Sequence, residues 1–346
     1  MTRKVDEKNE RIKRRYAHYL REAKRSDPAT VDKAMDAILR FERSTGVKSL
    51  RLFHIEQAVA FKRGLQADKN IRTGRPLSKA TIDGTLRAVK AFFHWLAGQP
   101  GYKSRISYAD SEYFNLSAKD ARIAHTQRDV PFPTLEQCRH AFAKMPEITI
   151  IDRRNKALFA FLMLTGARDG AIASMPLRAI DLVEGCVHQD ARFVKTKFAK
   201  TFTTAFFPVD PVFRAFFEAW VRYLREEAMF GHDDPLFPRP QMGLRDGSFA
   251  VTGLSREFYA SAGAMRDAIG AAFLQAGLPA FGPHSFRKTL GKLGSDLCQT
   301  PEQFKAWSQN LGHESVVTTI SAYCPVSQER QKQLIRGLKG VDGSGL

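Results

Sequence analysis

Cysteine, long apolar runs and an apolar N-terminus are scarce or absent in this sequence of 346 residues. The four cysteines lie far apart and form no C-x-x-C pair, so no zinc site is expected, and reduced thiols in a cytosolic protein are the simplest interpretation. No stretch approaches 18 consecutive apolar residues, and the charged N-terminus lacks the apolar run of a secretion signal. We therefore expect a cytoplasmic protein without a membrane span.

Acidic residues are in short supply relative to basic ones. The chain has 54 Lys and Arg against 36 Asp and Glu, which gives a formal net charge of +18 and a pI near 9.9. Such an excess predicts affinity for polyanions, chiefly nucleic acid or an anionic membrane surface. The excess is uneven, because residues 1–130 carry a net charge of +13 and the remainder only +5. This asymmetry suits a DNA clamp joined to a domain with a larger core, although a generically basic soluble protein is the plain alternative.

Helical patterns fill the first 100 residues. Asp27-Pro28 is a helix start, and Ser78 can cap a later helix that ends at Pro100-Gly101. Pro131 and Pro133 forbid a helix and mark a domain boundary. The predicted organisation is a helical domain over 1–115, a linker over 116–133 and a second domain over 134–346.

The second part begins with helices and contains one region with a strand signature. Thr134 caps a helix, and a buried apolar run follows over 158–164. Between Cys186 and Val209 the pattern indicates a β-hairpin, with 193–194 leading in and 203–207 leading out. Further helices are predicted at Asp210-Pro211 and over 265–274, 285–297, 301–310 and 328–338. The fold class is therefore mainly α, with a small β-sheet in the second domain.

Three short motifs bear residues suited to phosphodiester exchange without a metal. Thr165-Gly166-Ala167-Arg168 ends a buried helix, His284-Ser285-Phe286-Arg287 is an H-x-x-R pair, and Leu311-Gly312-His313-Glu314-Ser315 precedes Thr318-Thr319 and Tyr323. Arginine suits a phosphoryl transition state, because its guanidinium is always charged and can contact two oxygens at once. A phenol can attack phosphorus if a base or a positive field removes its proton, and a lysine or histidine can protonate the leaving oxygen.

In this order and with these separations, the motifs resemble the signature of the tyrosine recombinase (phage integrase) family. The resemblance covers most of 134–335, and residues 1–115 are similar to the family's core-binding domain in helix pattern alone. It implies the DNA breaking-rejoining fold, in which 1–115 is the DNA-binding domain and 134–346 is the catalytic domain. The two domains would close as a C-shaped clamp on duplex DNA, and the protein would work as a tetramer on DNA. It also implies recombination or integration of DNA, as for a mobile element, through a 3′-phosphotyrosine intermediate without metal, ATP or other cofactor.

The resemblance assigns a role to each motif residue. Arg168 and Arg287 would clamp the scissile phosphate, His284 would act as base or proton shuttle, and His313 would hydrogen-bond the phosphate or leaving group. Tyr323 would be the nucleophile. Each residue also has a structural reading: Arg168 could cap a helix, His313 could be a buried turn histidine, and Tyr323 could be a core aromatic.

The family's general acid is a lysine on the β-hairpin, and three candidates are present. Its usual spacing ahead of a proline, here Pro208, favours Lys200, whereas a turn centred on Phe198-Ala199 would favour Lys197. Lys195 is the third candidate. We assign the role to Lys200 and leave the other two open.

The sequence departs from the family pattern at two places, one near Arg168 and one between His313 and Tyr323. Ala171 stands where the family has an acidic residue, so Asp169 takes the orienting role or that support is missing. The ten-residue separation of His313 and Tyr323 is one longer than expected, which affects where the tyrosine helix starts. Candidate contacts to DNA phosphates are Arg72, Arg75, Lys79, Arg87, Lys90, Lys197 and Lys288.

Two other functions share parts of this pattern. A type IB topoisomerase or hairpin telomere resolvase would use the same chemistry, but His284 disfavours the topoisomerase, which usually has lysine there. A DNA-binding architectural protein could keep the fold without activity, although the intact arginines, histidines and tyrosine argue against it. The target site, the type of element and any accessory proteins are not readable from the sequence.

Overall fold

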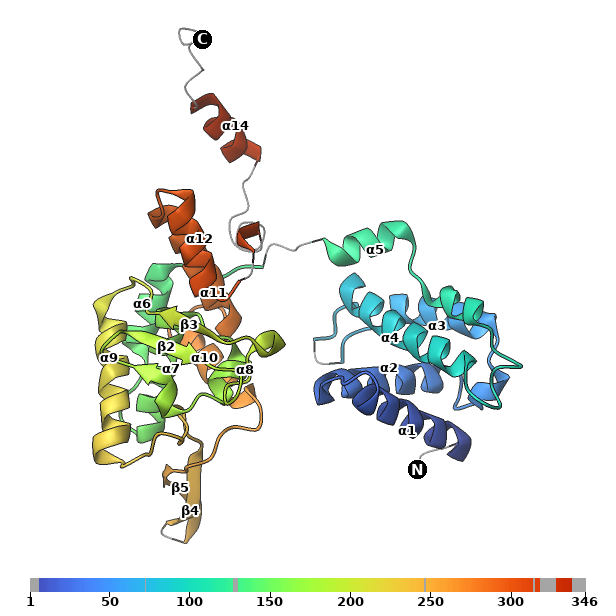
Figure 1. Ribbon diagram of the computed structural model, residues 1–346, viewed down its shortest axis with the longest axis horizontal. Coiled ribbons are helices and arrows are strands. Elements are labelled where there is room, and N and C mark those ends of the chain that lie inside the picture. The colour runs from blue at the N-terminus through green and yellow to red at the C-terminus, as the bar shows by residue number, and fades with distance from the viewer. Residues whose placement is uncertain are drawn as a thin grey trace. The chain divides into compact units, whose positions relative to one another are not determined.

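The computed structural model describes residues 6–71, 73–126, 130–245, 247–313, 315–317 and 328–337. The chain divides into two compact units, Met1–Arg128 and Asp129–Leu346, and each is described by itself (Figure 1). The division falls inside the segment 116–133 that the sequence analysis assigned to a linker. Within the described part of the chain, none of the helices combines the length and apolar character needed to span a bilayer.

Unit 1 is a helical bundle, coloured blue to green in Figure 1. Its helices are α1 (Glu7–Glu22), α2 (Pro28–Ser44), α3 (Ile55–Ala67), α4 (Lys79–Ala97) and α5 (Ala118–His125), with short 3₁₀ turns at Leu50–Leu52 and Tyr108–Phe114. The side chains of Asp27 and Ser78 accept hydrogen bonds from the backbone three residues on, which confirms both predicted helix starts. The helix α5 lies in the predicted linker and is held to α4 by the Lys79–Asp120 ion pair.

Over the residues that the structure describes, unit 2 is mainly helical with two small antiparallel sheets. Its helices are α6 (Leu135–Lys144), α7 (Ile150–Thr165), α8 (Asp169–Ala173), α9 (Pro211–Arg222, continued by a π-helical turn at Tyr223–Glu227), α10 (Gly263–Gln275), α11 (Pro283–Leu297), α12 (Pro301–Asn310) and α14 (Gln328–Gly337). The helix α7 forms the centre of the core, because every residue over 157–164 is at most 2% exposed. Phe159 contacts Phe286 of α11, and Phe161 contacts Phe217 of α9. The observed fold class is the predicted one.

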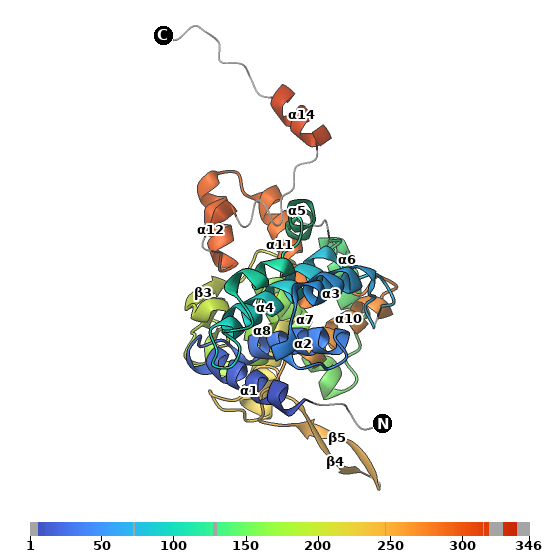
Figure 2. The same ribbon diagram turned by 90° about the vertical axis from the view of Figure 1, so that its right-hand side faces the viewer.

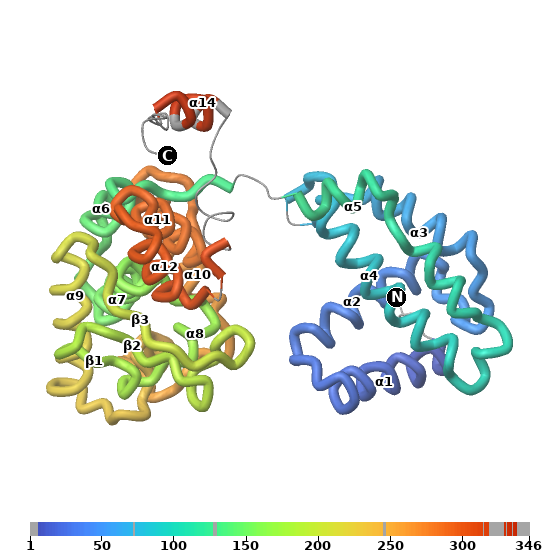
Figure 3. The backbone as a smooth tube through the Cα atoms, turned by 45° about the horizontal axis from the view of Figure 1, so that its top comes forward, coloured from blue at the N-terminus to red at the C-terminus, as the bar shows by residue number. Residues whose placement is uncertain are grey.

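The first sheet has the order β1 (Ile180–Asp181), β2 (Cys186–Gln189) and β3 (Phe202–Ala205), side by side in Figure 3. Cys186 pairs with Ala205, and Gln189 pairs with Phe202. The predicted hairpin is therefore present, but its first strand ends at Gln189, and the lead-in assigned to 193–194 was wrong. Phe193 and Val194 instead belong to a long connection, where their backbone N–H groups bond to Asp190 and Val194 is buried.

The second sheet is a hairpin that the sequence analysis did not predict. It pairs β4 (Pro240–Arg245) with β5 (Ser248–Leu254), and Figures 1 and 2 show it projecting from the rest of unit 2. A signal was available, because Met242 and Leu244 alternate with polar or small residues, as do Phe249 and Val251, around Asp246-Gly247. An Asp-Gly pair between alternating apolar residues is a strong hairpin signal.

Candidate functional site

The turn after α7 depends on a glycine. Gly166 has a φ of +57° and ends α7 in the left-handed conformation, where its N–H donates to the Leu162 carbonyl. A Cβ at this position would lie 3.0 Å from Leu311 and 3.1 Å from Leu290, so a larger residue would also clash. At this turn the chain leaves α7 and passes close to Leu290 of α11 and to Leu311, which follows α12. Arg168 then lies at the start of α8.

Arg287 is buried at the junction of two of the motifs, with only 2% of its surface exposed. Its Nη1 donates to the Gly166 carbonyl at 2.6 Å, and its Nη2 donates to the Leu311 carbonyl at 2.6 Å. The same Nη2 lies 2.8 Å from Nε2 of His313. One guanidinium thus joins segments that are 121, 24 and 26 residues away in the sequence. These contacts bring the T-G-x-R, H-x-x-R and L-G-H motifs into one site.

His313 is fixed in one tautomer by these contacts. Because a guanidinium can only donate, Nε2 of His313 accepts from Arg287, and the ring proton must lie on Nδ1. Burial, followed by the positive charges of Arg287 and Arg168, lowers the pKa of His313 to about 4. The histidine is therefore neutral at neutral pH and presents an N–H donor on the other side of its ring.

The lowered pKa of His313 predicts a loss of stability in acid. Protonation favours the unfolded chain, whose histidine has a pKa near 6.5, so the stabilisation is complete above about pH 6.5 and is lost as the pH falls towards 4. The expected loss in the free energy of unfolding is about 3 kcal/mol over the full window, of which about 2 kcal/mol falls between pH 7 and pH 5. Urea titrations of the wild type and His313→Gln at pH 7 and pH 5 measure it.

The substitution should reduce the pH dependence of stability in that window. His232→Gln, which removes an exposed imidazole from the same unit, controls for the loss of a histidine. Equal pH dependence in the wild type and His313→Gln would show that protonation of His313 is not coupled to folding.

His284 lies at the start of α11. Part of its surface is exposed, yet desolvation of the rest of its ring, followed by the charges of Arg287, Lys288 and Arg168, lowers its pKa. The nearby carboxylate of Asp169 acts in the opposite direction. A neutral imidazole at this position is able to accept a proton.

The turn before His313 is attached to the β-sheet by a residue that the sequence analysis missed. Asn310, at the end of α12, accepts from the Ala205 N–H at 2.7 Å and donates to the Ala205 carbonyl at 2.8 Å, as a neighbouring strand would. Gly312 has a φ of +71°, and a Cβ there would lie 2.7 Å from the ring of Phe202. Both contacts fix the position of His313 relative to β3. Neither has a sequence signal, because they join residues about 105 positions apart.

Asp169, the residue expected to orient Arg168, forms an ion pair with a different arginine. Asp169 binds Nε of Arg266 at 2.6 Å and also accepts from the Gly170 N–H. Ala171, where the family has an acidic residue, is buried in the core of unit 2. The orienting role of Asp169 towards Arg168 stays a prediction.

The three candidate lysines lie in the connection between β2 and β3. Lys195 and Lys197 are exposed, and Nζ of Lys197 lies 4.9 Å from the ring centroid of Phe198. Lys200 is half-buried, and its charge is one of those that lower the pKa of His313. Of the three lysines, Lys200 alone is among the charges that shift His313, so the electrostatics favour it.

Lys288, a candidate DNA contact, has a partner within its own unit. Its Nζ donates to the Val130 carbonyl at 3.1 Å and lies 5.9 Å from the ring centroid of Phe132. The next residue, Thr289, is buried and donates to the Pro133 carbonyl at 2.5 Å. This pair attaches the segment before α6 to α11.

Two predicted site residues lie outside the described residues. They are Tyr323 and Arg72, and the motif residues Glu314, Thr318 and Thr319 also lie outside the described residues. The nucleophile assignment is therefore not tested by the geometry. The predicted last helix is present as α14, where Ile335 is 63% exposed.

The candidate DNA contacts on α4 of unit 1 are paired with acids. Lys90 binds Glu112 at 2.8 Å, and Arg87 lies 3.5 Å from Asp83. Exposed pairs of this kind contribute little to stability, so these side chains can exchange partners at small cost. Arg75, also among the candidates, is exposed in the segment between α3 and α4.

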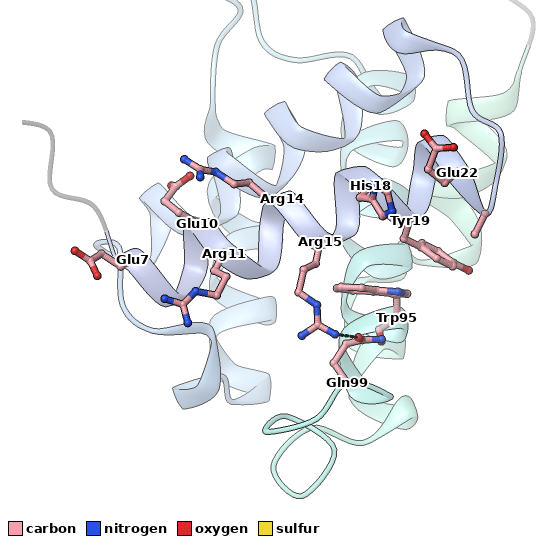
Figure 4. A pocket seen from close by; sticks show the side chains of 11 residues that line it. Glu7, Glu10, Arg11, Arg14, Arg15, His18, Tyr19, Glu22, Trp95 and Gln99 are labelled. Atoms are coloured by element: carbon pink, nitrogen blue, oxygen red, sulfur yellow. Dashed lines mark hydrogen bonds between the residues drawn. The ribbon is translucent and has the colours of Figure 1, made fainter.

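Two hollows in unit 1 add basic groups that the sequence analysis did not select. One, of about 1610 Å³, lies between α2, α3 and α4. Its cationic lining consists of Lys33, Arg40, Arg43, Lys48 and Lys69. The other, of about 880 Å³, lies along α1, and Figure 4 shows Arg15 pointing to Gln99 beside the ring of Trp95. Both hollows are lined by basic and acidic side chains. Because one lies along α1 and the other between α2, α3 and α4, the basic residues of unit 1 are spread over several of its faces.

The chain is similar to solved structures of DNA-bound integrases and recombinases. A lambda integrase dimer bound to a COC′ core site is 14% identical, with a TM-score of 0.61 over 96% of this chain and 98% of that one. The Tn1549 transposon integrase in complex with circular intermediate DNA is 15% identical, with a TM-score of 0.59 over 94% and 98%. XerH site-specific recombinase bound to a palindromic difH substrate is 17% identical, with a TM-score of 0.56 over 94% and 83%.

These likenesses show the fold. No protein-family model matches the chain, and no curated protein matches it. At 14 to 17% identity, the structural neighbours establish that the chain has the fold of the tyrosine recombinases, which confirms the fold prediction.

Proposed function

We propose that this chain is a site-specific DNA recombinase of the tyrosine recombinase family, which cleaves and rejoins DNA strands through a 3′-phosphotyrosine intermediate. The observation that carries the proposal is the buried guanidinium of Arg287, which joins the three motifs and contacts His313. A purely structural ion pair would need neither the neutral His313 nor the left-handed turns at Gly166 and Gly312. The fold of the DNA-bound integrases adds independent support.

Each group has a defined task in the proposed reaction. Arg168 and Arg287 would bind the nonbridging oxygens of the scissile phosphate, where negative charge grows in the transition state. His284, with its lowered pKa, would accept the proton of the Tyr323 phenol, and His313 would donate its Nδ1–H to the phosphate or the leaving oxygen. The phosphotyrosine bond retains the energy of the broken bond, so rejoining requires neither ATP nor a metal.

Binding would come mainly from phosphate contacts. The net charge of +13 on residues 1–130 supplies a sequence-independent attraction that falls as salt rises. The Lys79, Arg87 and Lys90 ion pairs would open to phosphates, and the cations of the hollow between α2, α3 and α4 would add further phosphate contacts. The protein would work in the cytoplasm on the nucleoid of a prokaryote or on phage DNA, as a tetramer in which the last helix docks on a neighbouring protomer.

Covalent trapping tests the proposal. Sites are first selected from a randomised duplex library by binding to the full chain, and then made as nicked suicide substrates that lose a short fragment after cleavage. The expected product is a protease-sensitive adduct on the 3′ phosphate, with mass spectrometry placing the nucleotide on the peptide that contains Tyr323. Tight binding without any adduct would contradict the cleavage reaction.

The choice of general acid predicts a specific defect and a specific rescue. Lys200→Ala should slow cleavage by about 10²–10⁴-fold, because the leaving sugar oxygen then departs without a proton. A substrate with sulfur in place of the bridging 5′ oxygen should restore the rate, because a thiolate needs no acid to leave. Single-turnover cleavage of both substrates measures the effect.

Lys195→Ala and Lys197→Ala are the matched controls, since they remove the same charge from the same connection. At saturating protein, where a weakened phosphate contact does not limit the reaction, both should cleave both substrates at close to the wild-type rate. Sulfur rescue of Lys197→Ala instead of Lys200→Ala would move the role to Lys197.

One observation favours a second candidate function. Arg287 is almost fully buried and bonded to two backbone carbonyls, which is what a structural arginine in an inactive, DNA-binding architectural protein would also show. The trapping experiment separates the two, because the architectural protein would bind the selected sites and form no adduct. A topoisomerase of type IB would form the adduct but would relax supercoils without needing a selected site.

A further inference from the structure

Three possible metal ligands meet on one face of the first sheet of unit 2. Asp181 of β1 is the register partner of Cys186 of β2, and His188 follows two residues later on the same strand. Because side chains alternate along a strand, Cys186 and His188 point to the same face. The core side of β2 is formed by Val187 and Gln189, so this face is separate from the core.

The ligand atoms of the cluster lie close together, and the Cys186–His188 distance matches that of a first coordination shell. The ligand atoms of Asp181, Cys186 and His188 all lie within 4.8 Å of one another. Sγ of Cys186 lies 3.7 Å from Nε2 of His188. Tetrahedral zinc, with bonds of about 2.3 Å to sulfur and 2.0 Å to nitrogen, places two such ligands about 3.6 Å apart.

The surroundings of the cluster orient its ligands. Nδ1 of His188 lies 3.0 Å from Oγ1 of Thr203, its register partner on β3. If Nδ1–H donates to Thr203, Nε2 is left with its lone pair directed at Cys186, and metal-bound histidines are typically held in this way. One oxygen of Asp181 accepts from the Val183 and Glu184 N–H groups at 2.9 Å each, which fixes the carboxylate.

We propose that Asp181, Cys186 and His188 form a zinc-binding site. A thiolate, an imidazole and a carboxylate together select Zn²⁺ over Mg²⁺ and Ca²⁺, which prefer oxygen ligands alone. Three protein ligands leave one position of the tetrahedron for water. Cys186 is only 7% exposed, whereas His188 is exposed, so the ion would be reached from the side of the histidine.

The proposal differs from the expectation drawn from cysteine spacing. That expectation excluded a zinc site because no two cysteines are close in the sequence, but this site needs a single cysteine. The separation of Asp181 from Cys186 reflects a tight hairpin, which places the two residues opposite each other. The site is independent of the proposed function, since the strand-transfer chemistry would not use the ion.

Bound zinc would stiffen the framework around the candidate general acid. The ion would link β1 to β2, and the His188–Thr203 bond extends the link to β3. The strands β2 and β3 flank the connection over 190–201 that contains Lys200. We therefore expect slower amide hydrogen exchange over 186–189 and 202–205 when zinc is bound.

Cobalt provides a spectroscopic test on the full chain, purified without a histidine tag and stripped with a chelator. One equivalent of Co²⁺ should give the visible absorption of a tetrahedral ion and a thiolate-to-cobalt charge-transfer band. Added Zn²⁺ should displace both signals in a one-to-one titration. Cys186→Ser should abolish the charge-transfer band, and the matched Cys298→Ser should retain it.

Two further variants distinguish the loss of a metal ligand from a folding defect. His188→Gln should weaken zinc binding strongly, and Thr203→Val, which touches no metal ligand atom directly, should weaken it by about 10–100-fold. His232→Gln should bind zinc as the wild type does, and circular dichroism should show each variant to be folded. A charge-transfer band that survives in Cys186→Ser, or the absence of any band in the folded wild type, would overturn the proposal.

Discussion

Tyr323→Phe is expected to abolish the covalent protein–DNA adduct while leaving DNA binding intact. The substitution removes the single oxygen that would attack phosphorus and keeps the aromatic ring, so the size and shape of the side chain change little. Loss of a nucleophile costs on the order of 10⁶ in rate, which places cleavage below detection. Suicide-substrate trapping and a binding titration on the same selected site measure the two quantities separately.

Tyr223→Phe is the matched control. Tyr223 lies in the same unit, where its ring stacks on Trp220, and it has no role in the proposed chemistry. It should form the adduct at the wild-type rate. An adduct of normal yield in Tyr323→Phe would exclude Tyr323 as the nucleophile, and peptide mapping of that adduct would identify the residue that acts instead.

The helical framework could be predicted because its signals are local. Asp27 and Ser78 cap helices through hydrogen bonds that span three residues, and the apolar run over 158–164 is long enough to require a buried helix. The order of the motifs along the chain also indicated the fold. The caps and the apolar run depend on residues near each other in the sequence, so no knowledge of the tertiary structure was needed to identify them.

The hairpin was predicted only in part, because its strands are short and their partners distant. Phe193 and Val194 have the composition of a strand, but Val194 is buried and its N–H bonds to Asp190, so tertiary packing overrides propensity. The error matters for function, because it affects where the three lysines lie. With β2 ending at Gln189, all three fall in the connection, and strand alternation cannot choose between them.

The contacts that hold the site residues in place could not be predicted from the sequence. Asn310 acts as a strand partner for Ala205, and Phe202 packs against Gly312, through contacts made only in the folded chain. The same is true of the carbonyls that hold Arg287. The motif identified which side chains belong to the site, whereas the structure shows which backbone groups fix Arg287 and His313.

Arg287→Lys should lower the cleavage rate by about 10²–10³-fold without loss of DNA affinity, because one ammonium cannot reproduce the forked contacts of a guanidinium. In the free protein, the two carbonyls of Gly166 and Leu311 and Nε2 of His313 are all served by the Nη atoms. Lysine can serve only some of these acceptors from a single nitrogen. A buried acceptor left unsatisfied costs about 1–3 kcal/mol, so a loss of stability of that size should accompany the loss of rate.

The two losses must be separated for the result to bear on chemistry. Arg256→Lys, which changes an exposed arginine paired with Asp234, controls for the substitution itself. Single-turnover cleavage at a temperature where both variants are folded gives the rate, and urea titration gives the stability. If Arg287→Lys cleaves within tenfold of the wild type, the guanidinium does not clamp the phosphate. Its burial and its carbonyl contacts would then mark it as a structural residue, and Arg168 would have to bind the scissile phosphate without it.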